Sequence, residues 1–198
     1  QEACGIAVND RGVISLEKGL GLVSEVFNEK KLSALRGEAA IGHVRYSSYS
    51  QNTWANAQPI VISHIKGNMA LTYNGRLVNA ARLRNELERQ GNIFQTTNDS
   101  EIIAYLIVRE RLNASSTEEA VARAVAYLEG AFSVVLMSPQ KMIAFRDSHG
   151  FRPLCIGRLK NSYMFSSESC VFSAVGAEFM RDVRPGEIAV IRDGELCS

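Results

Sequence analysis

Short apolar runs separated by tight-turn residues occupy both ends of this chain, and this pattern restricts the fold more than any single motif. Two hairpin signals lie in the first half, at Asn9-Asp10-Arg11-Gly12 and at Lys66-Gly67-Asn68. The apolar runs that flank them are residues 5–8 with 13–16 and residues 60–65 with 69–73. Such pairs are typical of antiparallel strands. Further strands are predicted at residues 39–45, 131–137, 142–145, 154–158, 163–166 and 187–191.

The middle of the chain has helical periodicity. Residues 77–90 place apolar side chains near a spacing of 3.6 and end at Gly91. A second helix is predicted at residues 102–108, where either Asp99 or Ser100 could provide the cap. Three other helical segments are expected: residues 118–128 after Thr117, one or two short helices within residues 22–35, and residues 170–175.

The order of strands, then helices, then strands, joined by tight turns, favours an α+β fold. We expect antiparallel sheets with helices on the outside rather than a doubly wound parallel sheet. The 198 residues, 46% of them apolar and 22% charged, can bury one core as a single domain. No repeat or linker divides them.

Charge and cysteine content exclude several classes of function. The net charge of +1 gives no basic excess for nucleic acid, and apolar runs such as residues 131–137 are too short for a membrane span. We expect a cytoplasmic protein, since no secretion leader is visible. Cys4, Cys155, Cys170 and Cys197 lie far apart without a CxxC pair, which argues against a metal site and a disulfide framework.

Residues 40–75 gather the polar groups that suggest chemistry. One apolar strand leads into Arg45, Tyr46 and a run of hydroxyls, and another is predicted to stop at Asn74-Gly75. An arginine suits a carboxylate, and a carboxamide beside a backbone N–H suits a developing oxyanion, so the pair indicates amide chemistry. Taken singly, Arg45 is more often a salt-bridge partner, Asn74-Gly75 a turn, and Asp99 a helix cap.

Four segments taken together resemble the class II glutamine amidotransferases. They are Gly42-His43-Val44-Arg45-Tyr46, Asn56-Ala57-Gln58-Pro59, Asn74-Gly75-Arg76-Leu77-Val78-Asn79 and Asn98-Asp99-Ser100-Glu101. This resemblance implies the N-terminal nucleophile (Ntn) hydrolase fold, a four-layer αββα sandwich of two mainly antiparallel sheets flanked by helices. Three later segments resemble the glutaminase domain of the amidophosphoribosyltransferase family: residues 146–154, 166–170 and 184–188.

The resemblance implies roles for individual residues. Arg45 would bind the α-carboxylate of glutamine, and Asp99 its α-ammonium group. The Asn74 side chain and the Gly75 N–H would form the oxyanion hole. Residues 47–56 would close over the substrate, with Tyr46 and Ser48 lining that loop. In this chemistry a cysteine thiolate attacks the amide and its own α-amino group transfers the proton.

The position of the nucleophile leaves two alternatives. Cys4-Gly5-Ile6 is similar to the opening Cys-Gly-Ile of these enzymes. In the register that we favour, however, residues 1–8 match an internal family segment, which places Cys4 at a small buried position. The nucleophile then lies upstream, and residues 1–198 form an amidotransferase domain that lacks its N-terminal strand and helix. Family members also usually carry His-Asn-Gly where this chain has Tyr73-Asn74-Gly75.

The resemblance further implies a glutaminase that supplies ammonia to phosphoribosyl pyrophosphate in de novo purine synthesis, within a homo-oligomeric glycosyltransferase. The phosphoribosyltransferase domain is absent from this chain. No cofactor is expected in the present domain; magnesium belongs to the absent half, and an iron–sulfur cluster there is left open. The alternative is a catalytically silent domain that binds glutamine or a partner protein.

Overall fold

The computed structural model describes residues 2–46 and 52–197. Its strands are β1 (Ala3–Asp10), β2 (Val13–Leu20), β3 (Ala39–Arg45), β4 (Ile60–His64), β5 (Gly67–Leu77), β6 (Gly130–Met137), β7 (Lys141–Arg146), β8 (Cys155–Leu159), β9 (Ser162–Ser166), β10 (Glu178–Asp182), β11 (Ile188–Arg192) and β12 (Glu195–Cys197). Its helices are α1 (Val23–Val26), α2 (Glu29–Ala34), α3 (Ala80–Arg89), α4 (Asp99–Arg111), α5 (Thr117–Val125) and α6 (Cys170–Val175). No helix in this described part of the chain is long and apolar enough to cross a membrane.

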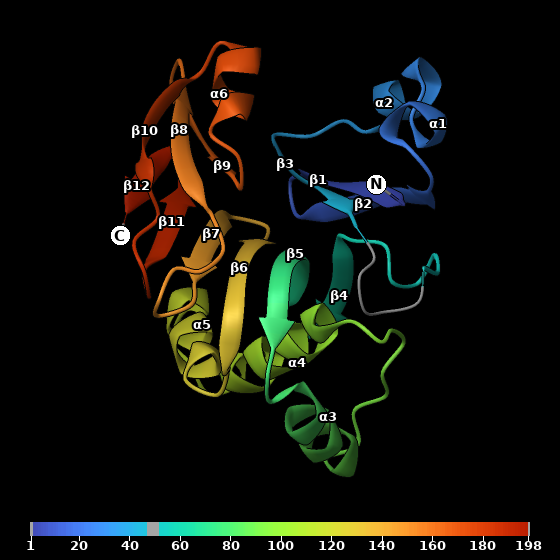
Figure 1. Cartoon of the computed structure of the whole chain (residues 1–198), viewed down its shortest axis with the longest axis vertical. Helices are drawn as coiled ribbons and strands as arrows, with labels where there is room; N and C mark the ends of the chain where they lie inside the picture. Colours follow the sequence, from blue (N-terminus) through green and yellow to red (C-terminus); the bar gives the residue numbers. More distant parts are fainter. Residues whose placement is uncertain (1, 47–51, 198) are drawn as a thin grey trace.

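The elements form four layers (Figure 1). Helices α3, α4 and α5 lie on one face of a six-stranded sheet of order β12-β11-β7-β6-β5-β4. Two three-stranded sheets, β2-β1-β3 and β10-β8-β9, lie beyond its other face, with α1, α2 and α6 outermost. Neighbouring strands are antiparallel throughout. The predicted αββα order is confirmed, except that two separate sheets make up the second β layer.

Alternation along β5 divides its side chains between two cores. Leu71, Tyr73 and Leu77 pack in the large cluster that includes the buried residues of α4. Ala70, on the opposite face, packs with Ala7 of β1 and other residues of the second layer. Because successive side chains of a strand point to opposite faces, Asn74 points toward the second layer and Tyr73 toward the helices.

The prediction that a strand stops at Asn74-Gly75 is wrong. Strand β5 continues to Leu77, with Asn74 opposite Ser133 and Gly75 opposite Phe132 on β6. A Cβ atom at position 75 would collide with the backbone of Ala131 and Phe132. The glycine is therefore required by the close approach of β6 and not by a turn.

Helix boundaries and short strands account for the other differences. Helix α3 begins at Ala80, later than predicted. The N-cap of α4 is Asn98, so Asp99 and Ser100 lie within its first turn. The short strands β10 and β12 were not predicted, because their exposed residues lack an apolar alternation.

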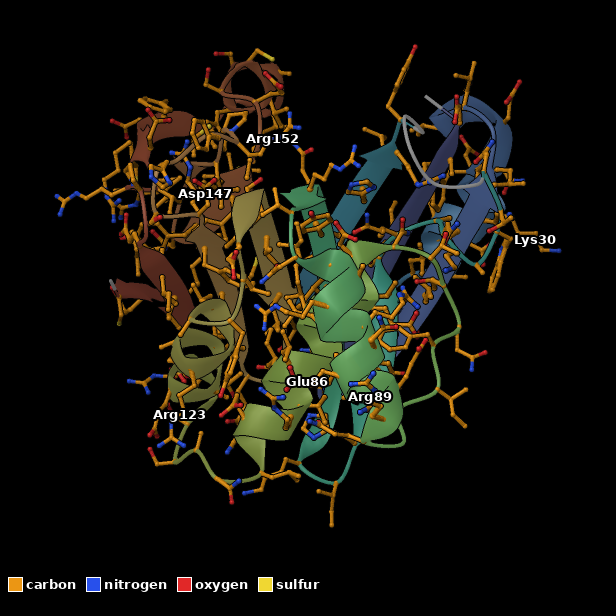
Figure 2. All side chains as sticks on the ribbon, turned by 60° about the horizontal axis from the view of Figure 1, so that its bottom comes forward. Lys30, Glu86, Arg89, Arg123, Asp147 and Arg152 are labelled. Carbon is orange, nitrogen blue, oxygen red and sulfur yellow. The ribbon has the colours of Figure 1, made fainter. Side chains whose placement is uncertain are left out.

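The loop after β7 is built around a buried carboxylate. Asp147 is 2% exposed and accepts hydrogen bonds from the backbone N–H groups of Phe132 (3.1 Å) and His149 (2.9 Å). Phe151 N–H also donates to it, at 3.2 Å. This loop carries Asp147 and Arg152, which are both labelled in Figure 2. These bonds fix the chain direction just before Arg152.

We expect Asp147→Asn to destabilise the protein by about 1–3 kcal/mol at neutral pH, because charged acceptors make the stronger hydrogen bonds. Burial alone would raise the pKa of Asp147, but the backbone donors, Phe132 first among them, lower it overall. The folded state therefore favours the carboxylate, and this stabilisation is present at neutral pH and is lost as the pH falls through the lowered pKa. Urea unfolding of both proteins across acidic pH checks this. A difference independent of pH would contradict it.

Candidate active site

One cavity of about 540 Å³ gathers residues from three distant segments. Arg45 and Tyr46 come from the end of β3, Asn74 and Gly75 from β5, and Asp99 from the first turn of α4. All five residues were predicted from the sequence as site residues, and the structure brings them together. Tyr46 stands at the rim with 81% exposure. Ser48, also named, lies outside the described residues.

The backbone of β5 presents a free N–H to this cavity. The N–H of Phe132 donates to the Asp147 side chain and its carbonyl accepts from the Asp147 N–H, so both groups point away from β5. Gly75, directly opposite, is thus in a non-hydrogen-bonded pair, and its own N–H points away from β6. On that side β4 pairs with β5 only as far as Leu71. Within the described residues, the Gly75 N–H has no partner.

The two neighbouring N–H groups on the same side of β5 have partners. Tyr73 N–H donates to the Gln58 carboxamide oxygen at 2.7 Å. Leu77 N–H donates to Asp99 Oδ2 at 2.9 Å. Gly75 lies between them, so the unpaired donor is framed by two fixed contacts. An amide held in this way suits an incoming oxyanion.

Asp99 is held from two directions. In addition to the Leu77 N–H, the Tyr73 hydroxyl donates to Asp99 Oδ2 at 3.2 Å. Burial, together with the Asp99 charge and this hydrogen bond, raises the pKa of Tyr73 far above its ordinary value. The hydroxyl therefore stays protonated and remains a donor. Since Oδ1 accepts no hydrogen bond from the described residues, it is available to a cationic ligand.

Arg45 is almost fully enclosed, with 5% exposure. Burial lowers the pKa of its guanidinium, while the charge of Glu2 opposes that effect. One of its nitrogens donates to Asn52 Oδ1 at 3.4 Å. Because the ordinary pKa of arginine is so high, the group keeps its charge, and its planar donors suit a carboxylate.

The carboxamides of residues 56 and 58 hold the walls of the cavity together. Gln58 donates to the Tyr73 carbonyl at 3.1 Å and accepts from the Tyr73 N–H, which ties its loop to β5. Asn56 exchanges hydrogen bonds with Thr97 at 2.9 and 3.0 Å, just before α4. In the sequence, both residues were part of a segment that resembles the family, but their hydrogen bonds to Tyr73 and Thr97 were not predicted.

His43 and Arg152 also line the cavity and were not predicted as site residues. Burial lowers the pKa of His43 to about 4, against a hydrogen bond to the Tyr73 backbone, and the Arg45 charge lowers it further. The imidazole is therefore neutral, and its Nδ1 has no partner among the described residues. The charge of Arg152 lowers the pKa of the Tyr73 hydroxyl, against the larger effect of burial. The sequence offered one indication for these two residues: each lies in a segment that resembles the family.

Cys4 lies on the wrong face of its sheet to reach the cavity. It is 1% exposed and packs against Val26 and Phe27 beside α1. Its partner on β3 is Val44, whereas Arg45 pairs with Ala3 and points to the opposite face. No cysteine lines the cavity in the described part of the chain, and no group of three or more metal-binding side chains occurs there.

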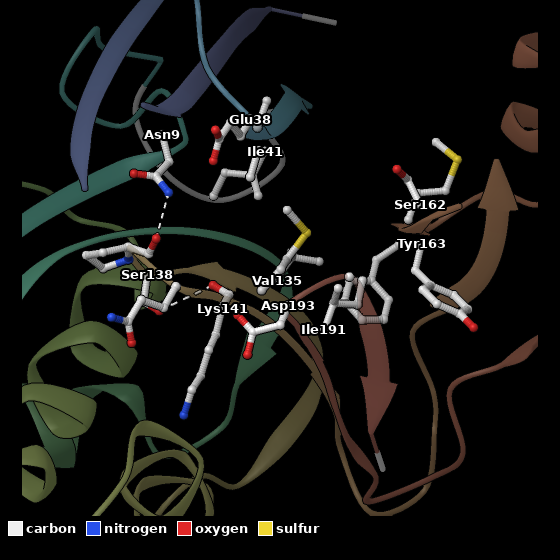
Figure 3. A pocket seen from close by; sticks show the side chains of 18 of the residues that line it. Asn9, Glu38, Ile41, Val135, Ser138, Lys141, Ser162, Tyr163, Ile191 and Asp193 are labelled. Carbon is white, nitrogen blue, oxygen red and sulfur yellow. Dashed lines mark hydrogen bonds between the residues drawn. The ribbon is translucent and has the colours of Figure 1, made fainter. Parts of the chain in front are cut away.

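A groove leads into the same cavity between the two sheets of the second layer. Its main part, of about 620 Å³, runs between β3 and β9 over a floor of β5, β6 and β7. Figure 3 shows Ile41 on one side, Ser162 and Tyr163 on the other, and Val135 between them. A smaller hollow of about 170 Å³ continues the groove to Asn74.

Comparisons with known proteins identify the family of this chain. Residues 43–174 match the family described as "Glutamine amidotransferase domain". The chain is 46% identical over 198 residues to the amidophosphoribosyltransferase of Methanocaldococcus jannaschii, covering all of this chain and 42% of that protein. It is 40% identical over 194 residues to the Bacillus subtilis enzyme, covering 98% and 40%.

A solved structure gives the same result. The glutamine phosphoribosylpyrophosphate amidotransferase of B. subtilis, complexed with ADP and GMP, superposes with a TM-score of 0.93 at 39% identity. The match covers all of this chain and 42% of that one. The chain thus spans about two fifths of the length of these relatives. It belongs to the family of class II glutamine amidotransferase domains.

Proposed function

We propose that this chain is the glutaminase domain of an amidophosphoribosyltransferase, and that it binds glutamine and helps to release its amide nitrogen as ammonia. The observation that carries the proposal is the arrangement around one cavity of a buried guanidinium, a fixed carboxylate and an unpaired backbone N–H. These three groups complement the two ends of an amino acid and the oxyanion of its reacting amide.

Each group has a distinct task. Arg45 binds the α-carboxylate of glutamine, and Asp99 accepts from the α-ammonium group through its available Oδ1. The Gly75 N–H and the Asn74 carboxamide donate to the oxygen of the side-chain amide as it becomes tetrahedral. This contact is stronger in the transition state than in the ground state and therefore accelerates the reaction.

The reaction needs a thiolate that attacks the amide carbon. The tetrahedral intermediate then expels ammonia, once its nitrogen has received a proton, and leaves a thioester. Water adds to the thioester, and collapse of the second intermediate releases glutamate and returns the proton to the enzyme. The oxyanion donors serve both intermediates.

We propose that this thiolate belongs to the first residue of a further strand, which precedes the present segment and occupies the groove. In the described part of the chain, β3 and β9 are edge strands. Both run toward the active-site cavity, since Gly42–His43 and Phe165–Ser167 line the hollow next to Asn74. A strand antiparallel to both would begin at that end, beside the oxyanion donors. Its α-amino group could then transfer the proton.

The larger protein would pass ammonia to phosphoribosyl pyrophosphate in purine synthesis. The names of the relatives support this step, which requires a magnesium-dependent phosphoribosyltransferase domain outside this chain. We place the protein in the cytoplasm as a homo-oligomer, with glutamine as the substrate of this domain.

A second candidate is a domain that binds glutamine without hydrolysing it. It is favoured by one observation: in the described residues, no cysteine reaches the cavity. The two candidates differ in whether glutamate is formed.

In the complete protein, we expect Arg45→Ala and Asp99→Ala each to raise the KM for glutamine by about 10- to 100-fold, because each removes a charged hydrogen-bond partner. Turnover with added ammonia should be unchanged. Steady-state kinetics with both nitrogen sources test this, and Arg89→Ala, on the exposed end of α3, is the control. Unaltered glutamine kinetics in both variants would reject the site assignment.

Asn74→Ala should act on the chemical step instead. We expect the glutaminase kcat to fall by about 10²- to 10³-fold with little change in KM, as for other lost oxyanion donors. Asn68→Ala, at the other end of β5, is the matched control. A rise in KM at constant kcat would assign Asn74 to substrate binding and contradict its proposed role.

The nucleophile can be identified by labelling the complete protein with 6-diazo-5-oxo-norleucine, a glutamine analogue that alkylates the attacking thiol. We expect the adduct on an upstream N-terminal cysteine, and we expect Cys4→Ala to keep full glutaminase activity. Peptide mass spectrometry locates the adduct. An adduct on Cys4 would overturn the proposed register, and glutamine binding without any adduct would favour the silent domain.

A further inference from the structure

We propose that a second cavity, at the opposite end of β5 from the active site, binds a small phosphorylated anion. This cavity of about 260 Å³ lies between the β4–β5 hairpin, the end of α4 and the β6–β7 turn. Its lining includes His64, Lys66, Arg111 and Lys141, contributed by these three segments. No aspartate or glutamate is among the described residues that line it. The inference is independent of the proposed function.

The positive charges of this basic cavity are only partly compensated. Lys141 forms an ion pair with Glu118, with its ammonium 2.7 and 2.8 Å from the two carboxylate oxygens. Arg111 donates to the Ala114 carbonyl at 2.8 Å. Among the described residues, neither Arg111 nor Lys66 lies within 4.0 Å of a carboxylate oxygen. Two cations therefore face the cavity without a counter-ion from the described chain.

The excess positive charge affects the pKa of His64. Burial lowers its pKa first, and the charges of Arg111 and Lys66 lower it further. Its Nδ1 accepts from the Lys66 N–H at 3.3 Å, which leaves Nε2 as the donor. An anion between the three groups would be attracted by both cations and would favour protonation of the imidazole.

The donors identify the class of ligand. Arg111 brings a guanidinium, Lys66 an ammonium and His64 an imidazole N–H to the lining of one cavity, and Thr117 adds a hydroxyl. A tetrahedral oxyanion matches donors that converge from several sides, and Arg111 can bind two of its oxygens at once. The small volume restricts the ligand to a phosphate group with a short organic part, and the net charge of +1 gives no overall basic excess for a nucleic acid.

The test is calorimetric titration of the complete protein with inorganic phosphate at constant ionic strength. We expect Lys66→Gln and Arg111→Gln each to weaken one class of sites by about tenfold, because each removes a charged donor. Arg89→Gln makes the same change of charge on α3, at a position labelled in Figure 2, and should bind as the wild type does. Glutaminase activity without phosphate should be the same in all four proteins.

A second measurement uses sulfate, which stays fully ionised across neutral pH. Because the anion favours protonated His64, the affinity for sulfate should rise as the pH falls. His64→Gln should abolish this pH dependence at the basic cavity. Arg111→Gln should remove the same contribution, since it weakens binding at that cavity. Lys66 is exposed in a turn, so its variant tests the site even if Arg111→Gln unfolds. Equal phosphate and sulfate binding by Lys66→Gln and Arg89→Gln would overturn the proposal, whatever the outcome for glutamine hydrolysis.

Discussion

The antiparallel ladder between β5 and β6 is the constraint on which the candidate site depends. It requires the N–H groups of Tyr73, Gly75 and Leu77 to point to the same side, away from β6. Gln58 and Asp99 accept from the first and last of them. The middle one is unpaired among the described residues, and glycine alone fits there, beside the backbone of β6. The proposed oxyanion donor thus results from sheet register and not from a flexible turn.

The same ladder connects the two proposed binding groups, Asp99 and Arg45, to the proposed oxyanion donor. Asp99 accepts the Leu77 N–H, two residues beyond Gly75, and Arg45 enters from β3 on the opposite wall. The bonds of Asn56 and Gln58 connect those walls. Because these contacts are backbone or buried carboxamide bonds, the distance between the Asp99 carboxylate and the Gly75 N–H is set by the scaffold.

Most of the fold could be predicted from hydrophobic pattern and turn residues, and the rest depended on tertiary contacts. Residues 9–12 and 66–68 form the expected hairpins because local turn chemistry agrees with the strand register. Asn74-Gly75 misled the local prediction, since β6 and the Asp147 loop extend the strand through a turn dipeptide. His43 could not be assigned from sequence, because its neutral state depends on burial by residues distant in the chain.

Tyr73 shows how a departure from the family pattern can serve the site. The resemblance led us to expect histidine before Asn-Gly, and a histidine could be charged or neutral at this position. The tyrosine hydroxyl cannot ionise at neutral pH, because burial and the Asp99 charge raise its pKa. It therefore donates to Asp99 without bringing a competing positive charge. In the role that we propose for Asp99, the carboxylate can attract an ammonium group while a neutral donor fixes its orientation.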